Sequence, residues 1–408
     1  MAVLSVTRRR FLVFSGVAGA AALAGGATQV PWSQLFDAAS TSPLPPGQGV
    51  LVVVTLYGGN DGLNTVVPAS DPAYQKARPD LAYQPHEVLD LGDGLGLNPG
   101  MTGMKSLWDN KELAIVRGVG YPVPDHSHFR SMAIWQTASP ATSVPTGWLG
   151  RWLDATGDDP LRAVSVEPVM PPLLAGARAT AASLPVDGLK MPAGRVNDAF
   201  AALGKPQQGE SELPARVATS MVDLQNAARV LGGAVHDAGD PTPDKGKQGA
   251  LAQQLGVVAE LVEAGVPPRV YSVSMGGFDT HADERGTQQS LLTELDGALT
   301  PFVNRMKTTQ RGQQVVVLVY SEFGRRVAAN GSDGTDHGTA GPVFVMGSHV
   351  RGGFYGTQPS LTDLDNGDLK ESTDFRSVYG TMLDGVLGTD AGQVLDNFPT
   401  RVDNLLST

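Results

Sequence analysis

Carboxylates and imidazoles follow two β-branched runs in the second half of the chain. Asp279 and His281 come after Val270–Ser274, and Glu322 comes after Gln314–Tyr320. Short β-branched runs without charges are typical of strands that are buried on both faces of a parallel sheet. The carboxyl ends of such strands meet at one edge of an open α/β sheet, where binding sites usually lie. The sequence therefore predicts an active-site edge here.

Asp336 and His337 form a further pair, in a glycine-rich loop beyond the second run. Aspartate, glutamate and histidine on neighbouring loops are a ligand set that suits a divalent metal. We therefore expect a divalent metal ion as cofactor, with zinc, calcium and magnesium as the candidates.

An aspartate also follows Val50–Leu56, the strongest strand signal in the chain, which we expect to be the central strand. The next residues read GGNDGLNT, and Asp61 lies where a first metal ligand would be. Glycines let the backbone turn sharply and approach a ligand. The alternative is an ordinary tight turn, in which Asp61 satisfies backbone groups. The buried type of the preceding strand favours the functional interpretation.

Ser127 lies between two imidazoles at the expected start of a helix. His126 and His128 flank it, and Arg130 follows. Apolar residues from Phe129 to Trp135 have helical spacing, so Ser127 falls near a helix N-terminus, whose free N–H groups favour an oxyanion. This pattern is typical of a nucleophile or an anion site. The alternative is a plain helix cap.

Hydrophobic periodicity predicts the elements that position these residues. Further strands are expected at Leu113–Val116, Ala163–Val166 and Gly341–Gly347, and helices at Leu213–Leu231, Gln248–Ala264, Arg285–Met306 and Thr373–Leu387. A strand, a helix and a next strand in turn predict an α/β fold with a mostly parallel central sheet and helices on both faces. The region around 195–265 is expected to be a helical insertion over the sheet edge.

Residues 1–39 are expected to be an export signal and residues 40–408 a single domain. Thr7–Leu12 matches the twin-arginine pattern, and the apolar stretch Leu12–Ala24 is too short to span a membrane. A cleavage site is expected near Ala38–Ser40. This predicts export by the twin-arginine translocation machinery, with no stable membrane span after processing. The alternative is a retained N-terminal anchor.

The net charge and the absence of cysteine argue against some classes of function. The chain has 30 Lys and Arg against 41 Asp and Glu, and without residues 1–39 the numbers are 27 and 40, hence a net charge of −13. Such an acidic protein is a poor candidate for nucleic-acid binding, which relies on Lys and Arg to neutralise phosphates. The chain has no cysteine, which excludes disulfides and thiolate chemistry.

Several motifs, in order along the chain, resemble the domain-of-unknown-function 1501 (DUF1501) family of exported bacterial proteins. After the leader RRRFL they are LYGGNDGLNTVVP (56–68), HSHFRSM (126–132), GWLGR (147–151), GGFDTH (276–281), SEFGR (321–325), DHG (336–338) and DFRSVY (374–379). That family in turn resembles the alkaline-phosphatase and sulfatase superfamily. The resemblance implies a mostly parallel α/β fold that carries metal ligands on its strand-end loops.

The same resemblance implies roles for individual residues. Asp61 would be the first-strand ligand, Ser127 the nucleophile, Asp279 and His281 paired ligands, Glu322 the second-strand carboxylate and His337 the last imidazole. Two features depart from the superfamily: Glu322 is followed by Phe323 where an Asp is usually followed by His, and Asp279 and His281 are unusually close in sequence. A one-metal or metal-free site therefore stays open, and Thr65 is a rival hydroxyl to Ser127.

The implied function is a metal-dependent hydrolase or transferase that acts on phosphate or sulfate esters outside the cytoplasm. A divalent ion would polarise a phosphoryl or sulfuryl oxygen. Arg130 or Arg325 would bind the oxyanion bidentately, although a surface ion pair is an alternative for Arg325. The rival class is a non-catalytic exported binding or assembly protein with a degenerate site, which the missing imidazole after Glu322 favours.

Overall fold

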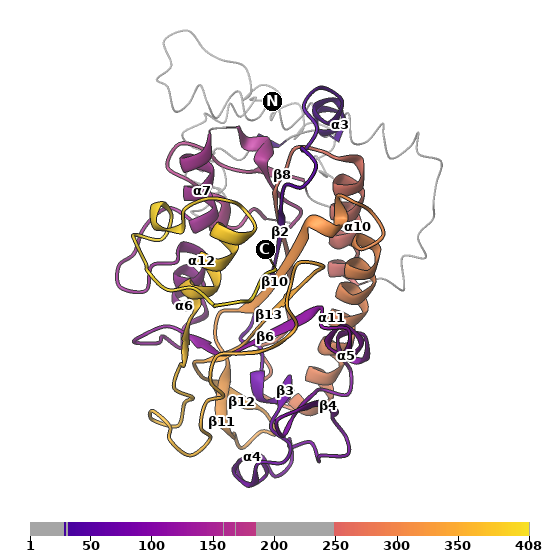
Figure 1. Cartoon of the computed structure of the whole chain (residues 1–408). Coiled ribbons are helices and arrows are strands. Elements are labelled where there is room, and N and C mark those ends of the chain that lie inside the picture. Colours follow the sequence, from indigo (N-terminus) through magenta and orange to yellow (C-terminus); the bar gives the residue numbers. More distant parts are fainter. Residues whose placement is uncertain (1–27, 30–31, 158, 168, 185–248, 408) are drawn as a thin grey trace, which may run out of the picture.

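The structure is a computed structural model that describes residues 28–29, 32–157, 159–167, 169–184 and 249–407 (Figure 1). The predicted helix Leu213–Leu231, most of the predicted insertion and residues 1–27 of the predicted signal lie outside these residues.

The apolar run Val50–Leu56 forms β2, in the middle of a ten-stranded sheet. All seven of its residues are buried, and successive side chains point to opposite faces, as the pleat of a strand requires. Val50, Val52 and Val54 join the apolar cluster on one face, and Leu51 and Val53 join the cluster on the other.

The strands of this sheet run mostly in one direction. Their order is β1 (Thr28–Gln29), β8 (Ala182–Ser183), β7 (Ala163–Ser165), β9 (Val270–Met275), β2, β10 (Val315–Ser321), β13 (Gly341–Met346), β6 (Leu113–Gly120) and β14 (Gly353–Tyr355), with β15 (Thr373–Asp374) also paired to β6. Among these described strands β13 is antiparallel to its neighbours and the other pairings are parallel. The predicted mostly parallel sheet is confirmed, with β2 at its centre.

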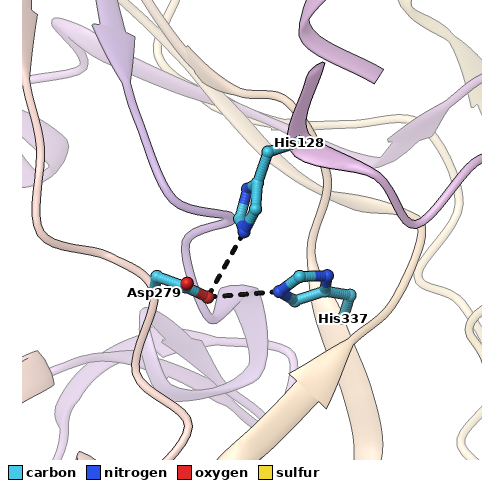
Figure 2. Close-up of side chains that lie close together, drawn as sticks. All are labelled: His128, Asp279 and His337. Atoms are coloured by element: carbon cyan, nitrogen blue, oxygen red, sulfur yellow. Dashed lines mark hydrogen bonds and ion pairs between the residues drawn. The ribbon is translucent and has the colours of Figure 1, made fainter. Parts of the chain in front are cut away.

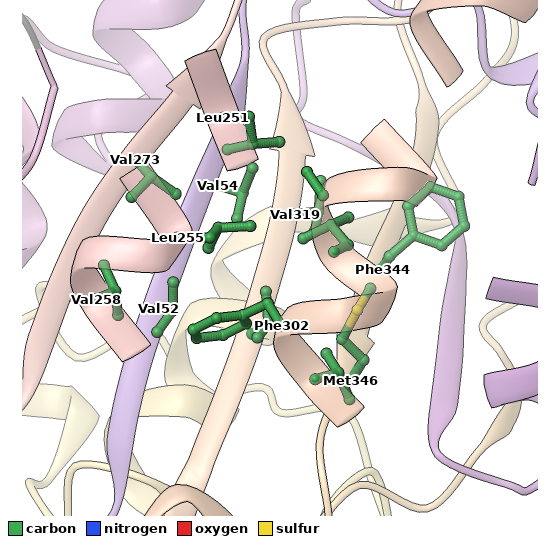
Figure 3. Packing of buried hydrophobic residues seen from close by; sticks show 14 of the residues in the cluster. Val52, Val54, Leu251, Leu255, Val258, Val273, Phe302, Val319, Phe344 and Met346 are labelled. Atoms are coloured by element: carbon green, nitrogen blue, oxygen red, sulfur yellow. The ribbon is translucent and has the colours of Figure 1, made fainter. Parts of the chain in front are cut away.

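Helices cover both faces of the sheet, as predicted (Figure 1). One face carries α5 (Thr102–Asp109), α10 (Ala250–Ala264) and α11 (Glu284–Met306), and the other carries α6 (His128–Thr137), α7 (Trp148–Thr156) and α12 (Phe375–Gly385). On the first face Leu255 and Phe302 lie over Val52 and Val54 (Figure 3). On the second face Trp135 of α6 stacks on Tyr320 of β10, with ring centroids 5.0 Å apart.

Two segments differ from the expected domain plan. Helix α10 lies within the predicted insertion but packs on the sheet face against α11 and β9, so it is a crossover helix leading into β9 and not part of a cap. Strand β1 and most of helix α3 (Trp32–Thr41) lie within the predicted signal segment, and Leu35 is buried in the first-face cluster. The length of the signal segment stays a prediction.

Smaller elements surround the carboxyl edge of the sheet. They are α4 (Pro72–Ala77), the three-stranded sheet of β3 (Val66–Val67), β5 (Leu95–Leu97) and β4 (Leu89–Gly92), and the hairpin of β11 (Arg325–Ala329) and β12 (Thr335–His337). Single 3-10 turns occur at Gly62–Asn64, Pro160–Arg162, Pro172–Leu174, Gly312–Gln314 and Ala391–Gln393. None of the helices in the described ranges is long and apolar enough to cross a membrane.

Candidate metal centre

Side chains from three separate segments meet at the carboxyl edge of the sheet (Figure 2). Asp279 and His281 lie in the loop after β9, His337 ends β12, and His128 is the first residue of α6. The ligand atoms of His128, Asp279 and His337 all lie within 4.8 Å of one another. His281 lies beside them, with its Nε2 atom 2.9 Å from His337 Nε2. The structure thus brings together three predicted metal ligands and one predicted catalytic histidine.

One oxygen atom of Asp279 is the meeting point of the cluster. Asp279 Oδ1 lies 2.7 Å from Arg325 Nη2, 3.0 Å from His281 Nε2, 3.1 Å from His337 Nε2 and 3.4 Å from His128 Nε2. Burial alone would raise the pKa of Asp279, but the hydrogen bond and the charge of Arg325 lower it to about 2. The carboxylate is therefore ionised at neutral pH.

The second ring nitrogen of His128 is directed towards this oxygen (Figure 2). Its Nδ1 atom lies 2.8 Å from Glu322 Oε1, and a carboxylate only accepts, so Nδ1 carries the proton. The other nitrogen, Nε2, is buried and has no hydrogen-bond partner in the described part of the chain. It lies 3.4 Å from Asp279 Oδ1, where an ion bound to both atoms would supply the missing partner.

His337 has the same arrangement. Its Nδ1 atom lies 2.7 Å from the main-chain carbonyl oxygen of His126. A carbonyl accepts only, so the proton again resides on Nδ1 and Nε2 keeps its lone pair. Burial lowers the pKa of His337, and the charge of Arg325 adds to this effect. The lowered pKa favours the neutral ring, whose Nε2 then carries its lone pair 3.1 Å from Asp279 Oδ1.

Potential ligand atoms of His128, Asp279 and His337 thus converge within 4.8 Å of one another, close enough for one cation to contact all three. Metal-bound histidines typically donate their second nitrogen to a carboxylate or a carbonyl, which is how His128 and His337 are held. Two imidazole nitrogens and a carboxylate oxygen match the preference of zinc and similar transition metals. Calcium and magnesium favour oxygen ligands, so the donor set fits them less well.

Glu322 was expected to be a metal ligand, and the structure gives it a different place. Its buried carboxylate accepts hydrogen bonds from His128 Nδ1 (2.8 Å), the Gly58 amide (2.9 Å) and Ser321 Oγ (2.9 Å). Glu322 therefore orients the His128 ring and is not one of the three residues that could hold an ion. Gly58 has φ +117°, and a Cβ there would lie 2.5 Å from the amide nitrogen of Asp279, so this close approach requires glycine.

Asp61, the expected first-strand ligand, is instead part of a buried ion pair. Its Oδ2 atom lies 2.5 Å from Arg78 Nη1, with both side chains fully buried. Its Oδ1 atom accepts a hydrogen bond from the Leu63 amide and so caps the following turn. Burial would raise the pKa of Asp61, but Arg78 and the surrounding hydrogen bonds lower it. The tight-turn interpretation was the correct one.

Asp336 lies next to the cluster but outside it. Its side chain is mostly exposed, accepts a hydrogen bond from Asn330 Nδ2 (3.2 Å), and lies 3.7 Å from His281 Nδ1. It therefore contacts a neighbour of the metal-binding group and does not belong to the group itself.

Arg325 was expected to bind an oxyanion, but its hydrogen bonds in the described part of the structure are all internal to the protein. It is buried and donates to the carbonyl oxygens of Gly58, Gly59, Phe278 and Thr335 and to Asp279 Oδ1. It therefore ties together three loops of the site. The surface ion-pair alternative does not apply, because Arg325 is buried, and its role in binding an oxyanion stays a prediction. Arg130, in the first turn of α6, has no hydrogen-bond or ion-pair partner within the described residues.

The two candidate hydroxyls differ in availability. Ser127 is the N-cap of α6, but its side chain is exposed and makes no capping hydrogen bond. Thr65 is fully buried, and its hydroxyl donates to the main-chain oxygen of Asp61 (2.7 Å) and accepts from Gln288 Nε2 (3.2 Å). Thr65 is therefore not accessible, and the nucleophile role of Ser127 stays a prediction.

Solved structures with a similar chain arrangement share little sequence with this one. A murine ectonucleotide pyrophosphatase/phosphodiesterase 5 in complex with AMP is 10% identical over 88% of this chain and 100% of that one, with a TM-score of 0.39. An alkaline phosphatase superfamily protein from Vibrio parahaemolyticus is 12% identical (82% and 73% covered, TM-score 0.35). The periplasmic domain of EcEptC from Escherichia coli, in complex with Zn, is 10% identical (75% and 77% covered, TM-score 0.34).

Among curated proteins, no sequence matches this chain. The family comparison is specific, and it covers residues 49–402, the whole span that carries the strand-end loops and the centre. The chain belongs to the family described as "Protein of unknown function (DUF1501)".

Proposed function

We propose that this protein is an exported, metal-dependent hydrolase or transferase that acts on phosphate or sulfate esters. The observation that carries the proposal is the buried, unpartnered Nε2 of His128 facing the ionised Asp279 beside His337. These three residues would hold one ion, preferably zinc. When bound, the ion would polarise a phosphoryl or sulfuryl oxygen and lower the pKa of a bound water or hydroxyl.

The protein's own groups supply orientation and charge. Glu322 and the His126 carbonyl hold the two imidazoles with Nε2 free, and Arg325 fixes the loop that carries Asp279. Arg130 lies in the first turn of α6, where the free N–H groups of the helix also favour an anion. Arg130 is therefore the cationic side chain that we propose for an anionic ester group bound at this helix N-terminus.

The partial exposure of the centre suits catalysis. The Asp279 side chain is 49% exposed and the His337 side chain 22% exposed, so the group is open to solvent on one side. Catalytic zinc sites keep a coordination position open for water or substrate, whereas structural sites are closed by protein ligands.

We expect the purified protein to contain about one equivalent of zinc or a similar transition metal, since one three-residue group is available. Replacing His128 by Ala should abolish retention of the ion, because it removes the nitrogen that lacks any other partner. His86→Ala, an exposed histidine, is the matched control. Metal analysis after gel filtration measures both variants, and aryl phosphate and aryl sulfate esters test turnover with and without a chelator.

A binding protein with a degenerate site is the second candidate, favoured by a specific observation. Arg325 is buried and donates to carbonyl oxygens inside the protein, and the Ser127 hydroxyl makes no capping hydrogen bond at the start of α6. Wild-type protein that holds metal but turns over no ester would support this candidate. Wild-type protein without metal or turnover would contradict the enzyme proposal entirely.

Export is part of the proposal and has its own test. Replacing Arg8 and Arg9 by Lys should leave unprocessed protein in the cytoplasm, because the twin-arginine pair in Thr7–Leu12 is the recognised feature of such leaders. Fractionation followed by immunoblotting measures this. Replacing Arg117 by Lys, far from the leader, serves as the control, and unchanged export of the double variant would refute the twin-arginine assignment.

A further inference from the structure

His337 depends on the backbone of a neighbouring loop. The His126 carbonyl oxygen accepts from its Nδ1 at 2.7 Å, and this contact keeps the proton on Nδ1 and the lone pair on Nε2. His126 belongs to the segment 121–127 between β6 and α6, and its side chain is 44% exposed. The position of one carbonyl in a surface segment therefore decides which nitrogen His337 presents to the centre.

A carboxylate from a distant part of the chain fixes the ring of His126. Asp368 Oδ2 lies 2.8 Å from His126 Nε2, although 242 residues separate them in sequence. The Asp368 side chain is only 5% exposed, and a buried carboxylate is costly unless it is paired and hydrogen-bonded. Its other oxygen has no hydrogen bond within the described residues and lies 3.6 Å from Arg326 Nε. His126 is thus the hydrogen-bond partner of this buried side chain.

Asp368 itself is held firmly by its own loop. Asp365 and Asp368 exchange two main-chain hydrogen bonds, of 3.0 and 2.9 Å. The Thr339 hydroxyl donates to the carbonyl oxygen of Leu369, which joins this loop to the segment that follows His337. The carboxylate is therefore a fixed anchor beside the strand that carries the predicted ligand.

We propose that Asp368 is a positioning residue of the metal centre: by holding the His126 ring, it keeps the His126 carbonyl on His337 Nδ1, so that His337 Nε2 faces the ion. The inference rests on the metal-binding part of the proposed function and not on the ester chemistry. Residues that hydrogen-bond to metal ligands and orient them typically lower the metal affinity about 10- to 100-fold when they are replaced.

Titration of the metal-free full chain with Zn²⁺ tests this role. Asp368→Ala should weaken Zn²⁺ binding about 10- to 100-fold, whereas Asp368→Asn should keep most of the affinity, because its amide oxygen still accepts from His126 Nε2. His126→Ala should match Asp368→Ala, and the double variant should be no weaker than either single one, since both act through the same contact. Asp363→Ala, an exposed aspartate of the same loop, should bind Zn²⁺ like the wild type.

A spectrum of the ¹⁵N-labelled histidines, of which the chain has seven, supplies a second readout without metal. His337 should carry its proton on Nδ1 in the wild type and in Asp368→Asn, and populate both tautomers in Asp368→Ala. Wild-type Zn²⁺ affinity in Asp368→Ala, or additive losses in the double variant, would overturn the proposal. If Asp368→Ala does not fold, the Zn²⁺ affinity and the His337 tautomer of His126→Ala test the proposal instead. Weakened Zn²⁺ binding in a protein that hydrolyses no ester would leave this inference standing while the proposed function fails.

Discussion

Replacing Arg325 by Met is expected to destabilise the protein by about 3–5 kcal/mol, the usual cost of removing one partner from a buried charged network. Methionine fills a similar volume but donates no hydrogen bond. The carbonyl oxygens of Gly58, Phe278 and Thr335 would lose their donor, and Asp279 would lose the charge that keeps it ionised. Because domains are typically stable by only about 5–15 kcal/mol, the loss would be a large fraction of the total.

Urea unfolding of the two proteins measures this difference. Arg351→Met is the matched control, because Arg351 is exposed, and surface changes usually stay within about 0.5 kcal/mol. Metal binding by any folded Arg325→Met protein should also be weak, since the loops carrying Asp279 and Gly58 are no longer tied together. Equal unfolding midpoints for Arg325→Met and the wild type would mean that these five hydrogen bonds do not hold the site.

The second large effect concerns Glu284 and the pH dependence of stability. Glu284 is fully buried at the start of α11, where it accepts a hydrogen bond from Thr335 Oγ1 (2.6 Å). Burial and the neighbouring Asp61 carboxylate raise the pKa of Glu284 to about 9. The native protein therefore keeps a proton that the unfolded chain releases near the ordinary glutamate pKa of about 4.3. Stability should then fall as pH rises from about 5 to 9, by at most about 1.4 kcal/mol per pH unit.

Glu284→Gln should remove this slope. The glutamine amide oxygen can accept from Thr335, and its NH₂ group can donate towards Asp61 without any proton to lose. The free energy of unfolding of the variant, relative to the wild type, should therefore increase steadily between pH 6 and pH 9. Denaturant unfolding at four pH values measures the difference, and Glu294→Gln, on the exposed side of the same helix, is the control. Parallel curves for Glu284→Gln and the wild type would show that the buried carboxyl is not protonated.

The fold was largely predictable because its signals are local. The β-branched runs at Val50–Leu56 and Val315–Ser321 are typical of strands in a buried sheet. The helical spacing of apolar residues after Asp283 predicts α11. The early part of the chain was harder to divide, because no sequence pattern near the predicted twin-arginine leader indicates that Leu35 packs against the sheet. That boundary depends on tertiary contacts, which no short stretch of sequence reveals.

The site was predicted less completely, for the same reason. The gathering of Asp279, His281 and His337 was predictable because each follows a recognisable strand or motif. Asp61 was misjudged because its partner, Arg78, lies seventeen residues away behind an irregular segment. Asp368 was missed because the contact that gives it a role spans 242 residues. Residue type and spacing predict which side chains gather at the sheet edge. They do not predict which carboxylate lies within the cluster and which carboxylates contact the histidines from outside it.

The central claim is that His128, Asp279 and His337 form one metal-binding group. Crystals of the full chain grown with zinc, with diffraction recorded on both sides of the zinc absorption edge, test it most directly. The account predicts a single strong anomalous peak about 2.0–2.2 Å from His128 Nε2, His337 Nε2 and an Asp279 carboxylate oxygen. A peak bound elsewhere, or an occupied zinc that leaves His128 Nε2 without contact, would contradict it.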